Sequence, residues 1–210
     1  MIAVDFEKEF PGIGIRARFS VPEGSTTVLW GESGAGKSTI LKCITGITRP
    51  DSGRIEIGGR AVFDSARRID QPPRLRGVGL VFQHYALFPH LSALENVALA
   101  LSGPDRSQAR SWLERFGIGH AADRRPATLS GGERQRLALA RTLAVHPAAL
   151  LLDEPFSALD RRTKTDVYRE FQRLRAELDM SVILVSHDRA EAEMLGDRIL
   201  EVVDGKAVYQ

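Results

Sequence analysis

The sequence predicts an α/β fold with a mainly parallel sheet, an N-terminal antiparallel β region and an inserted helical subdomain. Three near-continuous apolar runs are typical of strands that are covered on both faces, as in a parallel sheet. They span 78–82, 148–153 and 181–186. From about 85 to 145 the patterns are helical apart from loops, which indicates a subdomain inserted into the core. We therefore expect the core to comprise residues 1–84 and 146–210.

Local signals place individual elements along this pattern. Residues 26–30, TTVLW, form a short apolar run that ends at a glycine loop, so we expect a buried strand and then a helix that starts near Gly36. In the segment 53–59, GRIEIGG, Ile55 and Ile57 share one face of a predicted strand, which closes with a Gly-Gly turn.

Two further signals concern the middle and the end of the chain. Ser92 with Glu95 and Ser130 with Glu133 both match the capping box, so each pair predicts a helix N-terminus. The final segment 198–209, RILEVVDGKAVY, resembles two strands joined by an Asp-Gly turn.

Composition excludes several classes of protein. The 210 residues are 43% hydrophobic, and 29 basic residues face 27 acidic ones, so no basic surface for nucleic acid is indicated and we expect no nucleic-acid partner. Cys43 is the one cysteine, which excludes an internal disulfide and fits a reducing compartment. The N-terminus lacks the pattern of a signal peptide, and no apolar stretch approaches the roughly 20 residues that span a bilayer. We expect a cytoplasmic chain, for which any membrane-spanning part is another chain.

The stretch GESGAGKST matches the phosphate-loop pattern G-x-x-x-x-G-K-[ST] in full, and it follows a predicted strand. Its glycines let the backbone curl so that the N–H groups point inward. Lys37 would then reach the β- and γ-phosphates of ATP, and the Ser38 hydroxyl would bind Mg²⁺. A glycine turn before an ordinary helix is disfavoured, because all four fixed positions are present. The predicted nucleotide-binding residues are Gly31, Glu32, Ser33, Gly34, Ala35, Gly36, Lys37, Ser38 and Thr39.

Polar residues follow three of the predicted strands. Asp153 and Glu154 end the run LLLDEP, and ligands bind at the carboxyl ends of strands in α/β sheets. We expect Asp153 to be a Mg²⁺ partner and Glu154 to orient or deprotonate an attacking water. Gln83 and His187 follow two other strands at the same edge, and we expect His187 to contact the γ-phosphate. Taken alone each is an ordinary loop residue; the phosphate loop favours the functional interpretation.

The stretch LSGGERQR, 129–136, is a second segment with the features of a phosphate site. It combines a turn, a glycine pair and a helix start, where backbone N–H groups have no intrahelical partner. One chain thus carries two phosphate-facing helix starts, which raises the question of whether both serve the same ATP.

These motifs together resemble the ATPase of ABC transporters. The phosphate loop, Gln83, LSGGERQR, LLLDEP, SALD (157–160) and His187 occur in the order of that family, and the resemblance covers essentially the whole chain. It implies a phosphate-loop (RecA-like) ATPase core, a helical subdomain that carries LSGGERQR as the signature, and a head-to-tail dimer of two cassettes. The phosphate loop of one cassette would face the signature of the other across a shared ATP.

The resemblance also implies roles for single residues. Gln83 is assigned to Mg²⁺, to the attacking water and to sensing of the membrane partner, and Asp160 to communication across the dimer. The adenine base usually stacks on an aromatic residue near the N-terminus, for which Phe10 is the nearest candidate. The signature residues implied to face the γ-phosphate bound by the partner cassette are Ser130, Gly131 and Gly132.

A narrower resemblance concerns residues 61–97. The segments FDS, PP, VGLVFQ and LFPHLS follow one another there as in molybdate-importer ATPases. This implies transmembrane permease subunits as partners, an extracytoplasmic binding protein that acts indirectly, and a place on the cytoplasmic face of the inner or plasma membrane. Such ATPases usually continue into a small β-rich regulatory domain, and we expect these 210 residues to hold a single ATPase domain without it.

Other functions remain open at this point. LFPHLS and SALD are shared with importers of sulfate, iron, polyamines and sugars, so these substrates stay possible. Exporter cassettes also stay possible. Soluble ABC ATPases of DNA repair insert a long coiled coil between phosphate loop and signature, and no sustained heptads occur here. A degenerate cassette that binds ATP without cleaving it is disfavoured by Lys37, Glu154 and His187.

Overall fold

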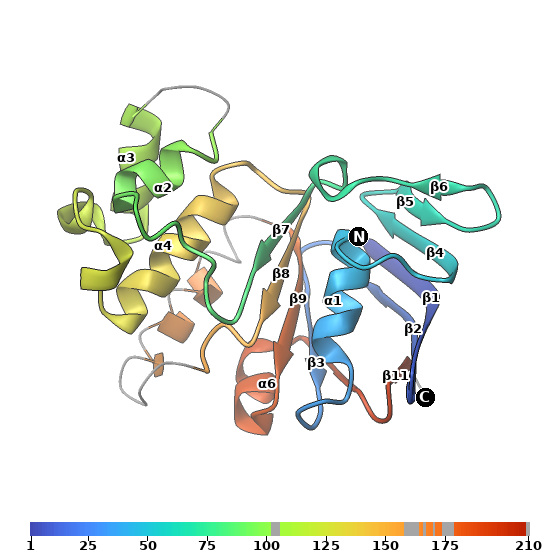
Figure 1. The fold of residues 1–210 in the computed structure, drawn as a ribbon. Coiled ribbons are helices and arrows are strands. Elements are labelled where there is room, and N and C mark those ends of the chain that lie inside the picture. The colour runs from blue at the N-terminus through green and yellow to red at the C-terminus, as the bar shows by residue number, and fades with distance from the viewer. Residues whose placement is uncertain (102–105, 158–163, 166, 170, 174–178, 209–210) are drawn as a thin grey trace. The chain divides into compact units, whose positions relative to one another are not determined.

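The computed structural model describes most of the chain as two compact units (Figure 1). The described residues are 1–101, 106–157, 164–165, 167–169, 171–173 and 179–208. The first unit comprises Met1–Leu80, Ala148–Glu154 and Phe171–Gln210, and the second comprises Val81–Pro147 and Pro155–Glu170. The segment 155–170, which the sequence analysis assigned to the core, thus groups with the helical unit.

The first unit is built from two sheets. The larger has the order β11-β2-β1-β4-β5-β6, and the smaller has the order β10-β3-β9-β8-β7. In the larger sheet β1 pairs antiparallel with β2 and β4, as expected for the N-terminal region. In the smaller sheet β3 pairs parallel with β9 and β10, and β8 pairs parallel with β9. The strands are β1 (Ile2–Phe10), β2 (Ile13–Val21), β3 (Thr26–Trp30), β4 (Ser52–Ile57), β5 (Arg60–Asp64), β6 (Ile69–Asp70), β7 (Val78–Val81), β8 (Ala149–Asp153), β9 (Ser181–Ser186), β10 (Arg198–Glu201) and β11 (Lys206–Val208).

The helix α1 (Lys37–Thr45) lies between the two sheets in Figure 1. Its apolar face, with Ile40 and Ile44 fully buried, packs in one core with the inward side chains of both sheets. The β1 strand alternates in burial, as expected for a sheet with one solvated face, whereas the side chains of β9 are buried throughout. The predicted apolar runs are therefore confirmed as strands. A short helix α6 (Arg189–Leu195) follows β9, and a 3₁₀ turn spans Pro73–Leu75.

The two strands and the Asp-Gly turn predicted at the end of the chain are confirmed, but the two strands do not form a ladder with each other. The two strands and the turn are present, and Asp204 and Gly205 both have positive φ. However, β10 pairs parallel with β3, and β11 pairs parallel with β2, so the two strands belong to different sheets. Each strand buries an apolar side chain in the core, Leu200 from β10 and Ala207 from β11. Burial against longer partner strands therefore determines the pairing, although the turn has the sequence of a hairpin.

A buried arginine holds the C-terminal end of α1. The Arg76 side chain is 0% exposed, and its Nη1 donates to the carbonyl oxygens of Cys43 and Ile44 at 2.9 and 3.0 Å. Its Nε donates to Gln71 O at 2.8 Å, and Nη2 donates to Asp70 Oδ1 at 3.0 Å. The guanidinium thus binds Ile44 O, shares Cys43 O with the C-cap Gly46 N–H, and places a positive charge at the negative end of the helix dipole. The Cys43 thiol is itself buried, and burial raises its pKa to about 12.

The second unit is helical. Its helices are α2 (Ala93–Ala98), α3 (Arg106–Arg115) and α4 (Gly131–Leu143), with 3₁₀ turns at Gly119–Ala121 and Pro126–Thr128. Both predicted capping boxes are confirmed, with Ser92 and Ser130 as the N-caps of α2 and α4. The three helices contact one another, and buried side chains such as Leu113 and Leu137 form their core. No helix in the described part of the chain is long and apolar enough to cross a membrane.

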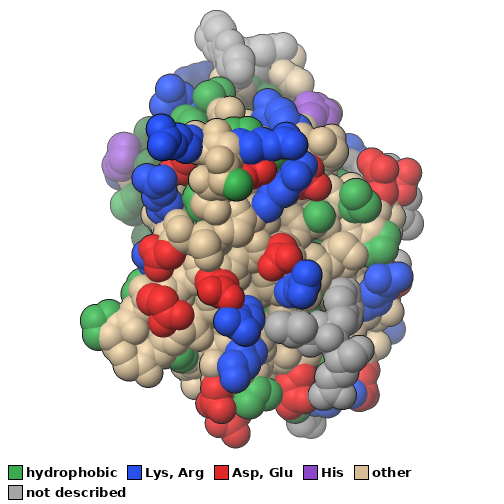
Figure 2. All heavy atoms as spheres, turned by 90° about the vertical axis from the view of Figure 1, so that its right-hand side faces the viewer, with side chains coloured by type: hydrophobic (Ala, Val, Ile, Leu, Met, Phe, Trp, Pro, Cys, Tyr) green, Lys and Arg blue, Asp and Glu red, His purple; other side chains and the backbone are tan. Residues whose placement is uncertain are grey.

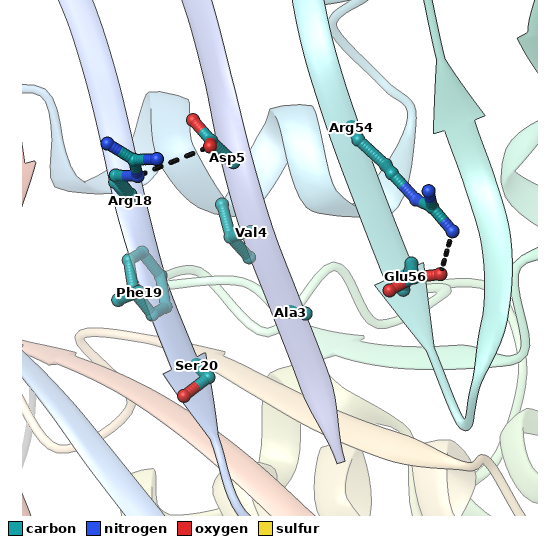
Figure 3. A pocket seen from close by; sticks show the side chains of 8 residues that line it. All are labelled: Ala3, Val4, Asp5, Arg18, Phe19, Ser20, Arg54 and Glu56. Atoms are coloured by element: carbon teal, nitrogen blue, oxygen red, sulfur yellow. Dashed lines mark hydrogen bonds and ion pairs between the residues drawn. The ribbon is translucent and has the colours of Figure 1, made fainter. Parts of the chain in front are cut away.

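The outer face of the larger sheet is charged and paired. Basic and acidic side chains are interspersed over the face in Figure 2. A shallow pocket on this face lies across β2, β1 and β4 (Figure 3). In it Arg18 lies 3.3 Å from Asp5, and Arg54 pairs with Glu56. Because carboxylates accompany these arginines, the pocket has no surplus of positive charge with which to attract a phosphate.

We expect the substitution Arg76→Met to lower the free energy of unfolding by about 1–3 kcal/mol, because it removes the donor that Arg76 supplies to Ile44 O and one of the partners of Cys43 O and of Asp70, which keep Gly46 N–H and Arg49. Urea denaturation of the purified chain measures this. Arg74→Met removes an exposed arginine two residues away and should change the free energy by at most about 0.5 kcal/mol. Equal effects of the two substitutions would contradict the role assigned to Arg76.

Candidate nucleotide-binding site

The phosphate loop joins β3 to α1, as the sequence predicts. Its conformation needs glycine at two positions. Gly31 has φ 156°, and a Cβ there would lie 2.3 Å from the carbonyl oxygen of Val202. Gly36 is the N-cap of α1 with φ 99°, and a Cβ there would meet the Ile15 side chain at 2.5 Å. The loop thus folds back closely on its neighbours and leaves the first N–H groups of α1 available for an anion.

Lys37 is the first residue of α1, and its side chain turns back over the loop. Its Nζ donates to the carbonyl oxygens of Gly31 at 2.8 Å and Glu32 at 2.6 Å. The residue is 4% exposed, and burial lowers its pKa, which nearby Glu154 and Asp153 act to raise. A cation is therefore placed at the centre of a loop that otherwise offers backbone dipoles.

Ser38 and Asp153 meet although 115 residues separate them. The Ser38 hydroxyl donates to Asp153 Oδ1 at 2.8 Å. Burial raises the pKa of Asp153, and the negative charge of Glu154 adds to this, while the hydrogen bond from Ser38 lowers it. Proton and metal compete for such a carboxylate, and a cation bound there would favour its ionised form.

These two oxygen donors fit Mg²⁺. That ion prefers hard oxygen ligands and is commonly held by one or two protein oxygens together with water and phosphate. Among the residues that the structure describes, no group of three or more His, Cys, Asp or Glu could hold a metal ion. A hydroxyl and a carboxylate beside a phosphate loop therefore suit an ion that binds together with the nucleotide.

Glu154 and His187 form a second pair at the same edge of the sheet. Glu154 follows β8, and its Oε2 lies 3.1 Å from His187 Nδ1 at the end of β9. Glu154 has φ 45°, a strained conformation for a residue with a side chain, and its N–H donates to Val185 O at 3.1 Å. Such strain is often found at functional sites. The structure thus brings Lys37, Ser38, Asp153, Glu154 and His187 to the carboxyl ends of β3, β8 and β9.

A cavity of about 630 Å³ adjoins the phosphate loop, a size that suits a small-molecule site. Its lining comprises Ile13, residues 30–35 and residues 201–204. Phe10, the candidate for adenine stacking, is not part of this lining; it pairs with Ile13 in the β1–β2 hairpin and lies under Lys8, with Nζ 5.4 Å from the ring centroid. The role of Phe10 stays a prediction. Ile13 is an apolar residue of the cavity lining that the sequence did not lead us to expect.

Residues 201–204 were also missed as part of this lining. The pairing of β10 with β3 places Glu201 beside Trp30, directly before the phosphate loop. The only sequence signal was the Asp-Gly turn, which does not indicate the partner strand. Parallel pairing with β3 therefore adds a wall to the cavity that the linear sequence does not reveal.

The signature residues lie in the second unit, at the start of α4. Ser130 is exposed, its Oγ accepts from Glu133 N–H at 3.3 Å, and its own N–H donates to Glu133 Oε2 at 2.7 Å. The hydrogen bond from the Ser130 N–H lowers the pKa of Glu133 to about 2, with smaller contributions from other neighbours. Gly131 and Gly132 form the first turn of the helix, so their N–H groups follow the exposed cap directly.

For two of the predicted site residues, the structure gives no position relative to the phosphate loop. Gln83 lies in a turn after β7 and is exposed, and it belongs to the second unit. Asp160 lies outside the described residues. Their assigned roles therefore stay predictions.

Comparison with known proteins identifies the family. Residues 16–157 match the family model described as ABC transporter. The chain is 41% identical over 97% of its length to the molybdenum import ATP-binding protein ModC of Methylococcus capsulatus, of which it spans 57%. It is 44% identical to the molybdate/tungstate import ATP-binding protein WtpC of Archaeoglobus fulgidus over 86% of its length and 75% of that protein. The sulfate/thiosulfate import ATP-binding protein CysA of Mycobacterium bovis is 46% identical over 90% of the chain and 54% of that protein.

A solved structure agrees with this result. The dimeric post-hydrolysis state of the ATP-binding cassette MJ0796 bound to ADP and Pi superposes with a TM-score of 0.81 at 31% identity, over 99% of this chain and 96% of that one. The chain belongs to the ABC transporter family.

We expect Glu154→Gln to leave ATP binding intact and to lower the rate of ATP hydrolysis by about 10²–10⁴, because the amide cannot accept the proton of an attacking water. Steady-state phosphate release and calorimetry of ATP binding measure the two effects. Glu193→Gln removes a carboxylate from the exposed surface of α6, where it pairs with Arg189, and should change neither quantity. A rate of ATP hydrolysis by Glu154→Gln within threefold of that of the unmodified chain would contradict the role assigned to Glu154.

Proposed function

We propose that this member of the ABC transporter family is the ATP-hydrolysing subunit of an importer that takes up an oxyanion, with molybdate as the substrate. One observation carries the enzymatic part. The hydrogen-bonded pair Ser38–Asp153 and the neighbouring pair Glu154–His187 meet at one edge of the sheet, beside the buried Lys37. This arrangement combines a phosphate loop, a Mg²⁺ site and a carboxylate that can act on water.

In the proposed mechanism the loop binds the phosphates of ATP. Backbone N–H groups at the start of α1 and the Lys37 ammonium hold the β- and γ-phosphates, and Ser38 and Asp153 hold Mg²⁺. When bound, the ion neutralises the charge that develops on the phosphate oxygens. Glu154 orients the attacking water and accepts its proton, and His187, which contacts Glu154 in the structure, reaches the γ-phosphate. Gln83, in the turn after β7, would be a further ligand of the ion and would help to orient the water.

The complete site needs two chains arranged head to tail. Ser130, Gly131 and Gly132 of one chain then face the γ-phosphate held by the loop of the other, and Asp160 acts across the same interface. The support is that the exposed cap of α4 presents a hydroxyl and free N–H groups, and that the similar MJ0796 cassette was solved as a dimer. Two phosphate-facing helix starts in one chain thus serve two different ATP molecules.

The substrate is proposed from the relatives. Molybdenum is named for a relative at 41% identity, molybdate and tungstate for one at 44%, and sulfate and thiosulfate for a third at 46%. All of these anions are tetrahedral oxyanions, so the relatives share one substrate class. We favour molybdate because the stretch 61–97 resembles that group of importers, with sulfate as the alternative.

The permease is proposed to dock on the loop between β7 and α2. In this loop Phe88 is 40% exposed, whereas Tyr85 is 5% exposed and belongs to the core of the helical unit. An exposed aromatic residue that follows Gln83 suits a groove that receives a short helix of a membrane subunit. The chain would then lie on the cytoplasmic face of the inner or plasma membrane, and the extracytoplasmic binding protein would act through the permease.

The substrate proposal is tested in a reconstituted complex of chain, permease and binding protein. We expect ATPase activity to rise when the binding protein carries molybdate, because the substrate signal passes through the permease to the ATP site. The matched comparison uses the binding protein loaded with sulfate and then without an anion. Stimulation by sulfate alone would move the proposal to a sulfate importer, and stimulation only by a sugar or polyamine importer's binding protein would refute the oxyanion class.

The two-chain site is tested with Ser130→Arg. The long side chain fills the space meant for the γ-phosphate of the partner cassette, so we expect ATP binding to persist while ATP-dependent dimers and hydrolysis are lost. Ser130→Ala removes the same cap without the bulk, at a cost of about 1 kcal/mol of helix stability, and should retain dimers.

A mixture sharpens this test. Chains with Ser130→Arg and chains with Lys37→Ala should each fail to form dimers when they are tested alone. Ser130→Arg blocks the space for the γ-phosphate, and Lys37→Ala weakens the binding of ATP itself. A composite dimer keeps one site in which loop and facing signature are both intact, so some ATP-dependent dimer should return on size-exclusion chromatography. Absence of an ATP-dependent dimer in the unmodified chain and in the mixture would contradict the head-to-tail site.

The docking surface is tested with Phe88→Asp. A carboxylate at this exposed position should weaken co-purification with the permease and uncouple transport from hydrolysis, while the isolated chain still folds and binds ATP. Leu99→Asp, at an exposed apolar position of the same unit that follows α2, is the matched control and should leave co-purification intact. If Phe88→Asp unfolds the chain instead, Phe88 serves the core and the docking assignment fails there.

A further inference from the structure

The loop that presents Phe88 is held in an unfavourable backbone conformation. Tyr85 and Ala86 are consecutive residues with φ 60° and 45°, in the left-handed region that residues with a side chain seldom adopt. The Ala86 N–H donates to His84 O at 2.7 Å across Tyr85, which is the hydrogen bond of a γ-turn with positive φ at its centre, a strained turn. Such a conformation persists only where surrounding contacts hold it.

Arg141 supplies those contacts on one side. Its Nη1 donates to Ala86 O at 2.8 Å and its Nη2 donates to Tyr85 O at 3.0 Å. The same guanidinium lies over the Phe88 ring, with its central carbon 5.4 Å from the ring centroid. Within the described part of the chain, no carboxylate pairs with Arg141. One planar group therefore binds both carbonyls of the strained pair and covers the exposed aromatic ring, a task that suits the rigid fork of arginine.

Asn96 on α2 fixes the remainder of the loop. It is 0% exposed, and its Oδ1 accepts from Phe88 N–H at 2.9 Å. Its Nδ2 donates to the carbonyl oxygens of Phe88, Leu91 and Ser92 at 3.1, 3.3 and 2.9 Å. Phe88 is thus the point where the contacts from α2 and from α4 meet, and its exposed ring is presented on a loop that is fixed from both directions.

Arg141 also links this loop to the signature. It lies in the last turn of α4, whose N-cap is Ser130. The ten residue-to-residue steps from Gly131 to Arg141 correspond to a helical rise of roughly 15 Å. The side of α4 that carries Leu137 and Ala140 is buried, and α4 contacts α2, so the helix is anchored in the unit along its length. One end of this short helix therefore carries the signature cap, and the other end carries Arg141, which contacts the Phe88 loop.

We propose that Arg141 is a positioning residue through which α4 makes the signature cap and the Phe88 loop move as one body. A displacement of Ser130 at the dimer interface would then shift Phe88 directly, in addition to any signal that passes through Gln83. The proposed function supplies the displacement of Ser130 and the partner that docks on Phe88. The contacts of Arg141 with Tyr85, Ala86 and Phe88 lie within the helical unit and do not depend on that function. These contacts and the coupled motion can therefore be tested separately.

The first test measures amide hydrogen exchange of the full chain without nucleotide. In Arg141→Met the amides of Ala86, Phe88 and Leu91 should exchange at least about tenfold faster, while amides in the middle of α4 keep their rates. Arg141→Lys should give an intermediate increase, because an ammonium group is a point charge that cannot bridge both carbonyls and stack on the ring.

The control for this test is Arg115→Met on α3. That substitution removes an arginine whose guanidinium carbon lies 5.2 Å from the Trp112 ring centroid, so it removes a comparable stacking contact in the same unit. The exchange rates of the loop should stay within about twofold. If Arg141→Met unfolds the chain, Arg141→Lys decides. Unchanged loop exchange in the Arg141 variants would overturn the proposal.

The second test adds ATP to chains that carry Glu154→Gln, which should form ATP-dependent dimers. Exchange at Phe88 should change on dimer formation when residue 141 is Arg and should not change, or change much less, when it is Met. An equal response in both chains would show that Arg141 transmits nothing and would overturn the coupling. If no dimer forms although ATP binds, the proposed two-chain site is contradicted and the coupling falls with it, whereas the first test still decides whether Arg141 holds the loop.

Discussion

The parallel pairing of β3, β9 and β8 is the constraint on which the candidate site depends. Its register sets Trp30 beside Ser186 and Asp153 beside Val185, so three strands end at one level of the sheet. The residues that follow these ends are the phosphate loop, His187 and Glu154. Hydrogen bonds over long sequence distances, such as Ser38 to Asp153, require this register, and a shift by one residue would turn Asp153 to the other face.

Local signals in the sequence predicted much of this arrangement. The run Thr26–Trp30 is a strand with the predicted bounds, α1 starts directly after Gly36, and both capping boxes form. These features depend on residues within one or two turns of each other, which is why a linear pattern reveals them. The phosphate loop belongs to the same class, because its glycines and lysine act within nine residues.

Non-local features were not predictable in this way. The strands β10 and β11 have the sequence of a hairpin, yet each pairs with an earlier strand, because their partners are determined by burial in a core formed from the whole unit. For the same reason Ile13 and Val203 were not expected to line the cavity beside the loop. The complete burial of Arg76 was hidden as well, since its acceptors belong to segments that surround it only in the folded chain.

The two units divide the chemistry of the chain. In the proposed function, the first unit supplies the groups that bind ATP and activate water, and the second supplies Gln83, the signature cap and the exposed Phe88. A chain divided in this way can bind ATP with one unit and present a partner surface with the other. The strained backbone at Glu154 and at Tyr85–Ala86 shows that both units hold unfavourable local conformations beside the residues assigned to function.

The buried thiol of Cys43 has a practical consequence for spectroscopy. Burial raises the pKa of this thiol to about 12, so the neutral thiol predominates at pH 7, and the side chain is fully buried in the core. An exposed thiolate is the nucleophile that attacks a maleimide or a thiol-reactive nitroxide reagent. One cysteine introduced on the surface of each unit can therefore carry a spin label or a fluorophore while the native residue stays in place. The distance between the two labels can then report motion of the two units in an otherwise unaltered chain.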